Sequence, residues 1–190
     1  MQPVPSLLFA ALALCLPSLD VAFAQQAAAP VTAQPNVTTA TYENWMLRCV
    51  RPAAAQTSAN DPGKICEIVQ TVQVQGQSQP LAQVAIGRLP GDKALTLTAV
   101  MPLNISIPGT VHLSGNGKTG AEEKGGLELS WQRCLPSGCI ATARPDAKLF
   151  ATLDPQTDGQ IRFADAAGRT LGIPLSWKGL DQALKALDKS

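Results

Sequence analysis

The segment Trp131-Gln132-Arg133-Cys134-Leu135-Pro136-Ser137-Gly138-Cys139-Ile140-Ala141 places two cysteines on either side of a four-residue turn. Pro136 and Gly138 are turn formers, and the turn is flanked by two short runs that are typical of strands, 127–134 and 139–143. The segment therefore predicts a pair of adjacent strands that a disulfide can join. A second pair of cysteines, Cys49 and Cys66, lies on two further extended runs.

Short extended runs separated by turn residues continue along the rest of the chain. Leu95 and Leu97 alternate with Thr96 and Thr98, as a half-buried strand requires. Leu180, Ala183, Leu184 and Leu187 recur at helical spacing after Gly179 and predict one amphipathic helix at the end. The strands predicted in order are 45–50, 65–75, 81–88, 94–101, 111–114, 127–134, 139–143, 148–153, 160–163 and 170–175.

This pattern predicts an all-β, mainly antiparallel domain. About nine or ten short strands with polar turns favour a β-sandwich or an open barrel, capped by the short C-terminal helix and carrying two disulfides. The domain is expected over residues 42–190, with order beginning near Trp45. Residues 25–41 contain Ala, Gln, Pro and Thr without charge, and we expect a flexible tether there.

The four cysteines allow three pairings. We expect local pairing, Cys49 with Cys66 and Cys134 with Cys139, because each pair closes a loop that a hairpin can present. The alternative joins distant strands, for instance Cys49 to Cys134 beside Trp131, as in immunoglobulin-like domains. A redox-active pair is disfavoured because four residues separate Cys134 from Cys139 and no helix start follows to lower a thiol pKa. A zinc site is disfavoured because an oxidising compartment favours disulfides.

Residues 1–24 predict a secretory signal peptide. The apolar run 7–16 is too short to span a bilayer, and Ala22-Phe23-Ala24 places small residues where signal peptidase requires them. We expect cleavage between Ala24 and Gln25, and therefore a periplasmic or extracellular protein. A lipoprotein anchor on Cys15 is the alternative, but Leu14 precedes this cysteine, where a small residue is required.

The charge balance excludes some classes of partner. The chain has 15 basic and 14 acidic residues, and the basic residues are scattered, so we expect no nucleic acid as a partner. No later run approaches the roughly 20 apolar residues of a membrane-spanning helix, so we expect no transmembrane segment in the mature chain.

No residue pattern points strongly to catalysis, and we expect no cofactor and no catalytic or metal-binding residue. His112 is the only histidine and lies in a predicted strand without any G-x-S-x-G motif in the chain, so a structural or surface role is expected. Glu122 and Glu123 lie in a polar, glycine-rich run and are expected to be solvated loop charges. A small hydrolase using carboxylates such as Glu67 and Asp165 is the alternative, which requires both groups to converge in one cleft.

Several segments occur in the order found in a known family. They are Trp45 with Cys49, the run 66–70, the corner 101–103, the cysteine hairpin 131–141 and the ending Pro174-Leu175-Ser176-Trp177-Lys178-Gly179-Leu180. From about residue 42 to residue 187 the chain resembles the invasion-associated locus B family of exported proteobacterial proteins. The resemblance implies a β-sandwich-like exported protein, linked in pathogenic members with entry into host cells, and it transfers no catalytic residue.

Together, these observations favour a non-enzymatic binding or envelope protein. We expect its partner to be a protein of the bacterial envelope or of a host cell. Sheet edges and loops held by the disulfides are expected to make the contact, because an exposed edge can accept a strand from a partner.

Overall fold

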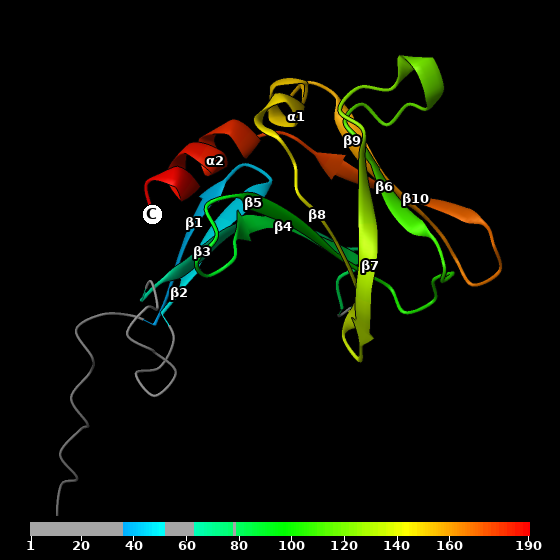
Figure 1. The fold of residues 1–190 in the computed structure, drawn as a ribbon, viewed down its shortest axis with the longest axis horizontal. Coiled ribbons are helices and arrows are strands. Elements are labelled where there is room, and N and C mark those ends of the chain that lie inside the picture. The colour runs from blue at the N-terminus through cyan, green and yellow to red at the C-terminus, as the bar shows by residue number, and fades with distance from the viewer. Residues whose placement is uncertain (1–35, 52–62, 78) are drawn as a thin grey trace, which may run out of the picture. The chain divides into compact units, whose positions relative to one another are not determined.

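The computed structural model describes residues 36–51, 63–77 and 79–190, which belong to the compact unit Gln34–Ser190. This part of the chain forms ten strands and two short α-helices (Figure 1). The elements are β1 (Val37–Tyr42), β2 (Trp45–Val50), β3 (Ile65–Val72), β4 (Ala82–Arg88), β5 (Leu95–Met101), β6 (Thr110–Ser114), β7 (Leu127–Leu135), β8 (Gly138–Ala143), α1 (Ala147–Ala151), β9 (Asp158–Ala164), β10 (Thr170–Ser176) and α2 (Leu180–Asp188).

The ten strands form one antiparallel sheet in the order β1-β2-β3-β4-β5-β8-β7-β6-β9-β10. Strands β1 to β5 lie in one half of the unit, and β6, β7, β9 and β10 lie in the other, with β8 between them (Figure 1). The sheet is bent, so that β10 at one end of the strand order contacts β3 near the other end. The predicted all-β class is confirmed.

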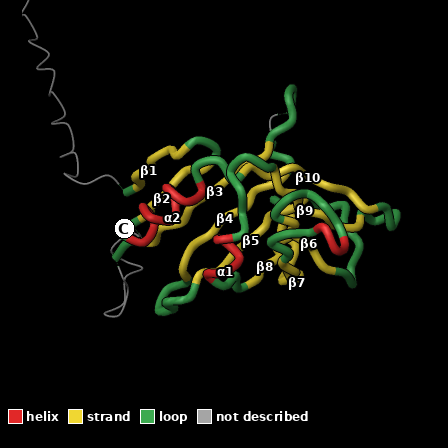
Figure 2. Tube along the Cα trace, turned by 90° about the horizontal axis from the view of Figure 1, so that it is seen from above, coloured by secondary structure: helices red, strands yellow, loops and turns green. Residues whose placement is uncertain are grey.

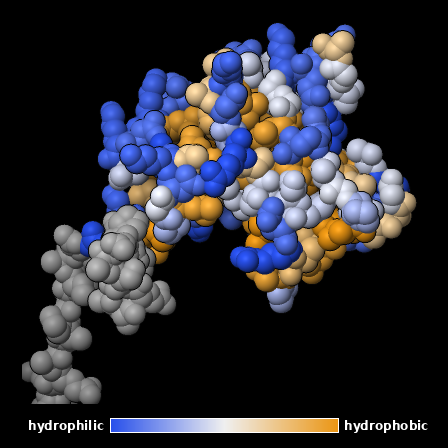
Figure 3. Space-filling model, in the orientation of Figure 1, coloured by the Kyte–Doolittle hydropathy of each residue, from blue (hydrophilic) through white to orange (hydrophobic). Residues whose placement is uncertain are grey.

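Alternating side chains of the strands form the core. In β5, Leu97, Ala99 and Met101 are buried, whereas Thr98 and Val100 between them are half-buried. Each large apolar side chain that is fully buried in this way stabilises the fold by about 1.5–3 kcal/mol. On the face shown in Figure 3, hydrophilic side chains alternate with hydrophobic patches.

The predicted C-terminal helix is confirmed as α2. Leu180, Ala183 and Leu187 are buried, and the helix packs on β1, β2 and β3. Figure 2, seen from above, shows α2 lying over these strands. Gly179 precedes the helix with φ 84°, and a Cβ at this position would lie 2.1 Å from the carbonyl oxygen of Tyr42. Only glycine fits there, because any side chain would meet the β1 backbone.

One predicted strand is wrong. Residues 148–153 were expected to be extended, but Ala147–Ala151 form helix α1. The carboxylate of Asp146 accepts the N–H of Leu149 at 2.8 Å and caps the first turn of the helix. A short apolar run fits a strand or one buried helical turn equally well, and the cap decides between them.

The ordered structure also begins earlier than expected. Val37–Tyr42 form strand β1, although residues 37–41 were expected within the tether and order was expected near Trp45. The strand is rich in β-branched residues and pairs with β2 from Val37 opposite Val50 to Tyr42 opposite Trp45. The expected signal peptide and the expected tether up to residue 35 lie outside the described residues.

Polar side chains hold β10 against the first half of the sheet. The side chain of Gln70, on β3, donates from Nε2 to the carbonyl oxygen of Ser176 at 2.6 Å, and the Ser176 N–H donates to Gln70 Oε1 at 2.9 Å. Trp45 Nε1 also donates to Ser176 O, at 2.9 Å. The Trp45 ring stacks on Trp177, with the centroids 6.4 Å apart, and Trp177 Nε1 donates to Gly115 O at 2.6 Å.

Candidate binding site at the Cys49–Cys66 end of the sheet

Both disulfides join neighbouring strands. Cys49 of β2 is bonded to Cys66, its register partner on β3. Cys134 of β7 is bonded to Cys139, its register partner on β8. The expected local pairing is confirmed, and the alternative bridge from Cys49 to Cys134 is wrong. Each bridge therefore fixes a strand pair and does not link the two halves.

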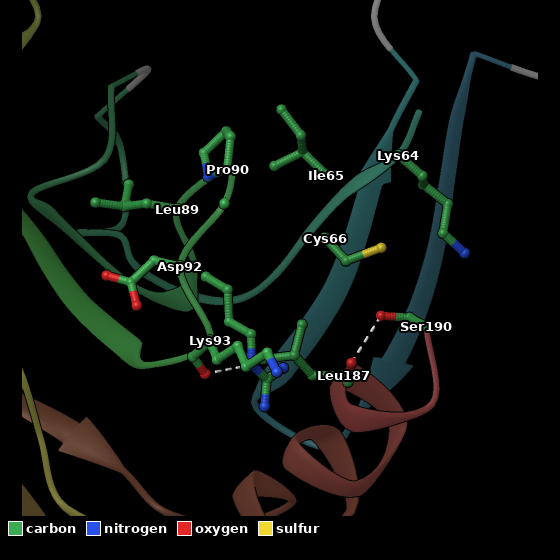
Figure 4. Close-up of a pocket in the computed structure, with 11 residues that line it drawn as sticks. Lys64, Ile65, Cys66, Leu89, Pro90, Asp92, Lys93, Leu187 and Ser190 are labelled. Atoms are coloured by element: carbon green, nitrogen blue, oxygen red, sulfur yellow. Dashed lines mark hydrogen bonds between the residues drawn. The ribbon is translucent and has the colours of Figure 1, made fainter. Parts of the chain in front are cut away.

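A cavity of about 350 Å³ lies at the Cys49–Cys66 end of the sheet. Its walls come from the start of β3, from the turn between β4 and β5, and from the end of α2 (Figure 4). This size falls near the lower limit for small-molecule sites, which span about 300–1,000 Å³. The lining residues are Lys64, Ile65, Cys66, Arg88, Leu89, Pro90, Gly91, Asp92, Lys93, Leu187 and Ser190.

The cavity borders a group of exposed apolar side chains. Leu89 is 55% exposed in the β4–β5 turn, and Ile65 is 36% exposed at the start of β3. Ile65 lies opposite Val50 on β2, which lies opposite Val37 on β1, and both valines are exposed. The three side chains form a cross-strand apolar row that runs to the edge of the sheet. An apolar group of this kind, rimmed by charge, is a feature of interaction sites.

Two of the four charged side chains that line the cavity, Arg88 and Asp92, are paired. Arg88 Nη2 lies 2.6 Å from the Asp188 carboxylate, and Arg88 Nε donates to Lys93 O at 3.1 Å. Arg144 Nη2 lies 2.6 Å from Asp92. The Ala94 N–H also donates to Asp92, and with Arg144 it holds the pKa of this carboxyl below its usual range.

Two cations of the lining remain without a partner. Within residues 36–51, 63–77 and 79–190, the ammonium groups of Lys64 and Lys93 form no hydrogen bond or ion pair. In Figure 4 these lysines lie on either side of Cys66. The cavity thus combines an apolar wall with two positive charges that have no partner in the described part of the chain.

His112 lies in a charged cluster on the other half of the sheet. Its Nε2 contacts the Glu123 carboxylate and its Nδ1 contacts the Glu128 carboxylate. Burial alone lowers the pKa of His112, but the hydrogen bonds to these carboxylates outweigh it and hold the pKa above its ordinary value. Arg162 Nη2 also lies 3.2 Å from Glu123, and its Nη1 donates to Lys118 O at 3.0 Å.

The two loop glutamates differ. Glu123 is mostly buried and paired, so its expected role as a solvated loop charge is wrong. Its ion pairs attach the loop before β7 to β6 and β9. Glu122 is exposed, as expected, and pairs with Lys118 at 3.1 Å.

The two carboxylates of the hydrolase alternative do not converge. Glu67 lies on β3 and pairs with Arg48. Asp165 follows β9, which is separated from β3 in the sheet by β4, β5, β8, β7 and β6. The guanidinium of Arg169 donates to Asp165, with Nε at 2.8 Å, and this hydrogen bond is the main cause of the lowered pKa of that carboxyl. Each carboxylate is thus an ion-pair partner on its own strand pair.

Comparison with known proteins connects this geometry to a family. A family model described as Invasion associated locus B (IalB) protein matches residues 45–188. The chain belongs to the IalB family. The crystal structure of invasion associated protein B from Bartonella henselae is similar in fold, with a TM-score of 0.61 and 20% identity over 80% of this chain and 95% of that chain. None of the curated proteins matches the chain.

Part of the pattern that carries the IalB resemblance lies where β10 meets the first half of the sheet. Gln70 ends the run 66–70, and Ser176, Trp177 and Gly179 belong to the C-terminal ending. Their hydrogen bonds and the Trp45–Trp177 stack hold the bent sheet in shape. In this IalB-family chain, these residues of the pattern therefore have a structural role.

Sequence reasoning missed Gln70 and the free lysines. Gln70 lies on the same face of β3 as Ile68 and is only 5% exposed, and a polar residue in a buried row was the available signal. Nothing in the sequence brings Lys64 near Lys93, because the cavity combines three separate segments. Among the described residues no helix is long and apolar enough to cross a membrane, and no group of three or more metal-ligating side chains forms.

Proposed function

We propose that this IalB-family chain is an exported, non-enzymatic binding protein that contacts its partner through the Cys49–Cys66 end of the sheet. The observation that carries the proposal is the row of exposed apolar side chains beside the cavity, whose lining includes two lysines with no partner among the described residues. The disulfide holds β2 and β3 in place, so little conformational entropy is lost when this surface is covered.

Export is part of the proposal. Two disulfides suit an oxidising compartment, either the periplasm or the extracellular space. The expected signal peptide fits that location. N-terminal sequencing of the protein recovered from its native bacterium tests this point: we expect the first residue to be Gln25, and a chain that retains residues 1–24 would contradict export by cleavage.

The class of partner is proposed from the family. The similar protein from Bartonella henselae is described as invasion associated. We infer that the partner is a protein of the bacterial envelope or of a host cell. The ion-paired positions of Glu67 and Asp165 support a binding role over hydrolysis, because a hydrolase of the kind considered needs both groups in one cleft.

Site-specific photo-crosslinking in the native bacterium tests the binding surface. A photoreactive amino acid replaces Leu89 in one variant and Leu171 in the control, which is 41% exposed on β10, away from the cavity. We expect a discrete adduct from position 89 that excess unlabelled protein suppresses, and none from position 171. Equal labelling at both positions, or no saturable adduct at position 89, would overturn the proposal.

A further inference from the structure

We infer that the cavity between β3, the β4–β5 turn and the end of α2 binds a small amphiphile with one aliphatic chain and an anionic head group. The inference rests on the proposed binding function and adds a small ligand in the cavity that borders the apolar row proposed to contact the protein partner. The ligand chemistry follows from the apolar wall, from the charges of the rim and from the rigidity of the floor.

The wall of the cavity is aliphatic on three sides. Ile65 comes from β3, Leu89 and Pro90 come from the turn, and Leu187 comes from α2 (Figure 4). Leu187 is buried at the base, whereas Ile65 and Leu89 are exposed around the opening. An aliphatic chain lying between them would remove apolar surface from water on both partners, which is the main driving force for such binding.

The charges of the rim select an anion. Arg88, Asp92 and Asp188 are satisfied by their own partners, so they offer little net charge to a ligand. Lys64 and Lys93 both line the cavity and are not paired within the described residues, so their positive charge would attract an anionic head group. A neutral head group would lack this charge attraction, and a cationic one would be repelled.

The floor of the cavity is held by covalent structure. Cys66 lines the cavity and is bonded to Cys49 on the neighbouring strand. The apolar wall on the β3 side therefore keeps its position without a ligand. A preformed cavity of about 350 Å³ suits a single chain, because a site of this size lies near the lower limit for small ligands.

Titration with three probes of equal chain length tests the inference. Decanoate and decyl phosphate carry anionic heads, and decanol is the neutral control, while acetate supplies a head group without a chain. Binding is followed by the amide NMR signals of Ile65, Leu89 and Lys93. We expect saturable shifts with decanoate or decyl phosphate, at least tenfold weaker binding of decanol, and none with acetate. Whichever of the two anionic probes binds with higher affinity shows whether the site prefers a carboxylate or a phosphate head group.

Two double variants distinguish the effect of the cavity lysines from the effect of the overall charge of the protein. Lys64→Gln with Lys93→Gln is expected to weaken decanoate binding at least tenfold and to leave decanol binding unchanged. The control, Lys148→Gln with Lys178→Gln, removes the same charge away from the cavity and is expected to change neither. Leu89→Ser is expected to weaken all probes that carry a chain. These side chains lie at the surface or at the rim, and the dispersion of the amide spectrum verifies folding.

The outcomes distinguish the ligand class from the function. Equal affinity for decanol and decanoate, or an equal effect of the two double variants, overturns the anionic amphiphile. If decanoate fails to bind while position 89 still gives a saturable adduct, only the ligand class is overturned. If both fail, the proposed binding surface is overturned as well.

Discussion

The side-chain amide of Gln70 forms two hydrogen bonds with the backbone of Ser176, in the way that a residue of a neighbouring strand would. The Gln70 amide donates to and accepts from the Ser176 backbone, and 106 positions separate the two residues in the sequence. The pair joins β3 to β10, which are seven positions apart in the strand order, and the bend of the sheet brings these two strands into contact. Gln70 therefore links the two halves of the sheet, and its replacement is expected to lower the free energy of unfolding.

Replacing Gln70 by alanine is expected to lower the free energy of unfolding by about 2 kcal/mol, because it leaves a backbone N–H without a partner and removes a bond to the carbonyl. Gln73→Ala is the matched control, since Gln73 is exposed and bonds only to Gln77 O at 3.1 Å. The control should change stability by less than about 0.5 kcal/mol. Urea denaturation of the two variants measures the difference, and equal effects would contradict the role assigned to Gln70.

Gly179→Ala is expected to destabilise the fold more than Gly168→Ala. Both glycines have positive φ, 84° and 77°, so alanine costs about 1–2 kcal/mol at either position. At Gly179 the new Cβ would also meet the Tyr42 carbonyl, whereas nothing lies within 4 Å at Gly168. Overpacking adds about 1–3 kcal/mol at position 179 only. Thermal unfolding of both variants checks this, and equal melting temperatures would mean that β1 moves aside freely.

Removing the two disulfides separately is expected to give unequal losses. The Cys49–Cys66 bridge spans 17 positions and the Cys134–Cys139 bridge spans 5. In the chain-entropy model these loops contribute about 3 and about 2 kcal/mol. The double variants Cys49→Ala/Cys66→Ala and Cys134→Ala/Cys139→Ala, unfolded in urea, give the two values. A larger loss from the second pair would show that native-state packing, and not loop closure, sets the contribution.

The His112 cluster is expected to make stability depend on pH. The pKa of His112 is raised in the folded chain, so the charged imidazole adds to the free energy of unfolding. This contribution is fully present below the pKa of the unfolded chain, and it is lost as the pH rises through the pKa of the folded chain. Glu128 has the opposite sign: burial raises its pKa, but hydrogen bonds from Thr110 and His112 lower it overall. Its contribution is present above its unfolded pKa and is lost as the pH falls through the folded pKa.

Comparison of the chain with its His112→Gln variant tests this sign. The difference in unfolding free energy should be larger at about pH 5.5 than at about pH 8.5, because a larger fraction of the imidazole is charged at the lower pH. Urea denaturation at both pH values measures it. A difference that is unchanged, or larger at the higher pH, would rule out a stabilising imidazolium.

The sequence predicts most of the elements because their signals are local. Alternation around Leu97 identifies β5, and the spacing of Leu180, Ala183 and Leu187 identifies α2. Residues 148–153 were assigned the wrong element because the deciding contact is the Asp146 cap. The hydrogen-bond partner of Gln70 could not be predicted, because it lies on a strand that is distant in the sequence.

The candidate site was only partly predictable for the same reason. The pairing of Cys49 with Cys66 follows from two extended runs that can form neighbouring strands. The cavity beside it requires the β4–β5 turn and the end of α2 to meet the start of β3. That meeting depends on how the whole sheet bends, and no local pattern in the sequence reports it.

The position of α2 has a consequence for a chain that emerges from its N-terminus first. Strands β1 to β3 are made early, yet the side chains that cover their inner face, including Trp177 and Leu187, are among the last residues to appear. Until then, Trp45 and Ile68 have no cover from the C-terminal segment. The strands that are synthesised first therefore gain their full packing last. Loss of helix α2 would leave β1, β2 and β3 without the helix that covers them.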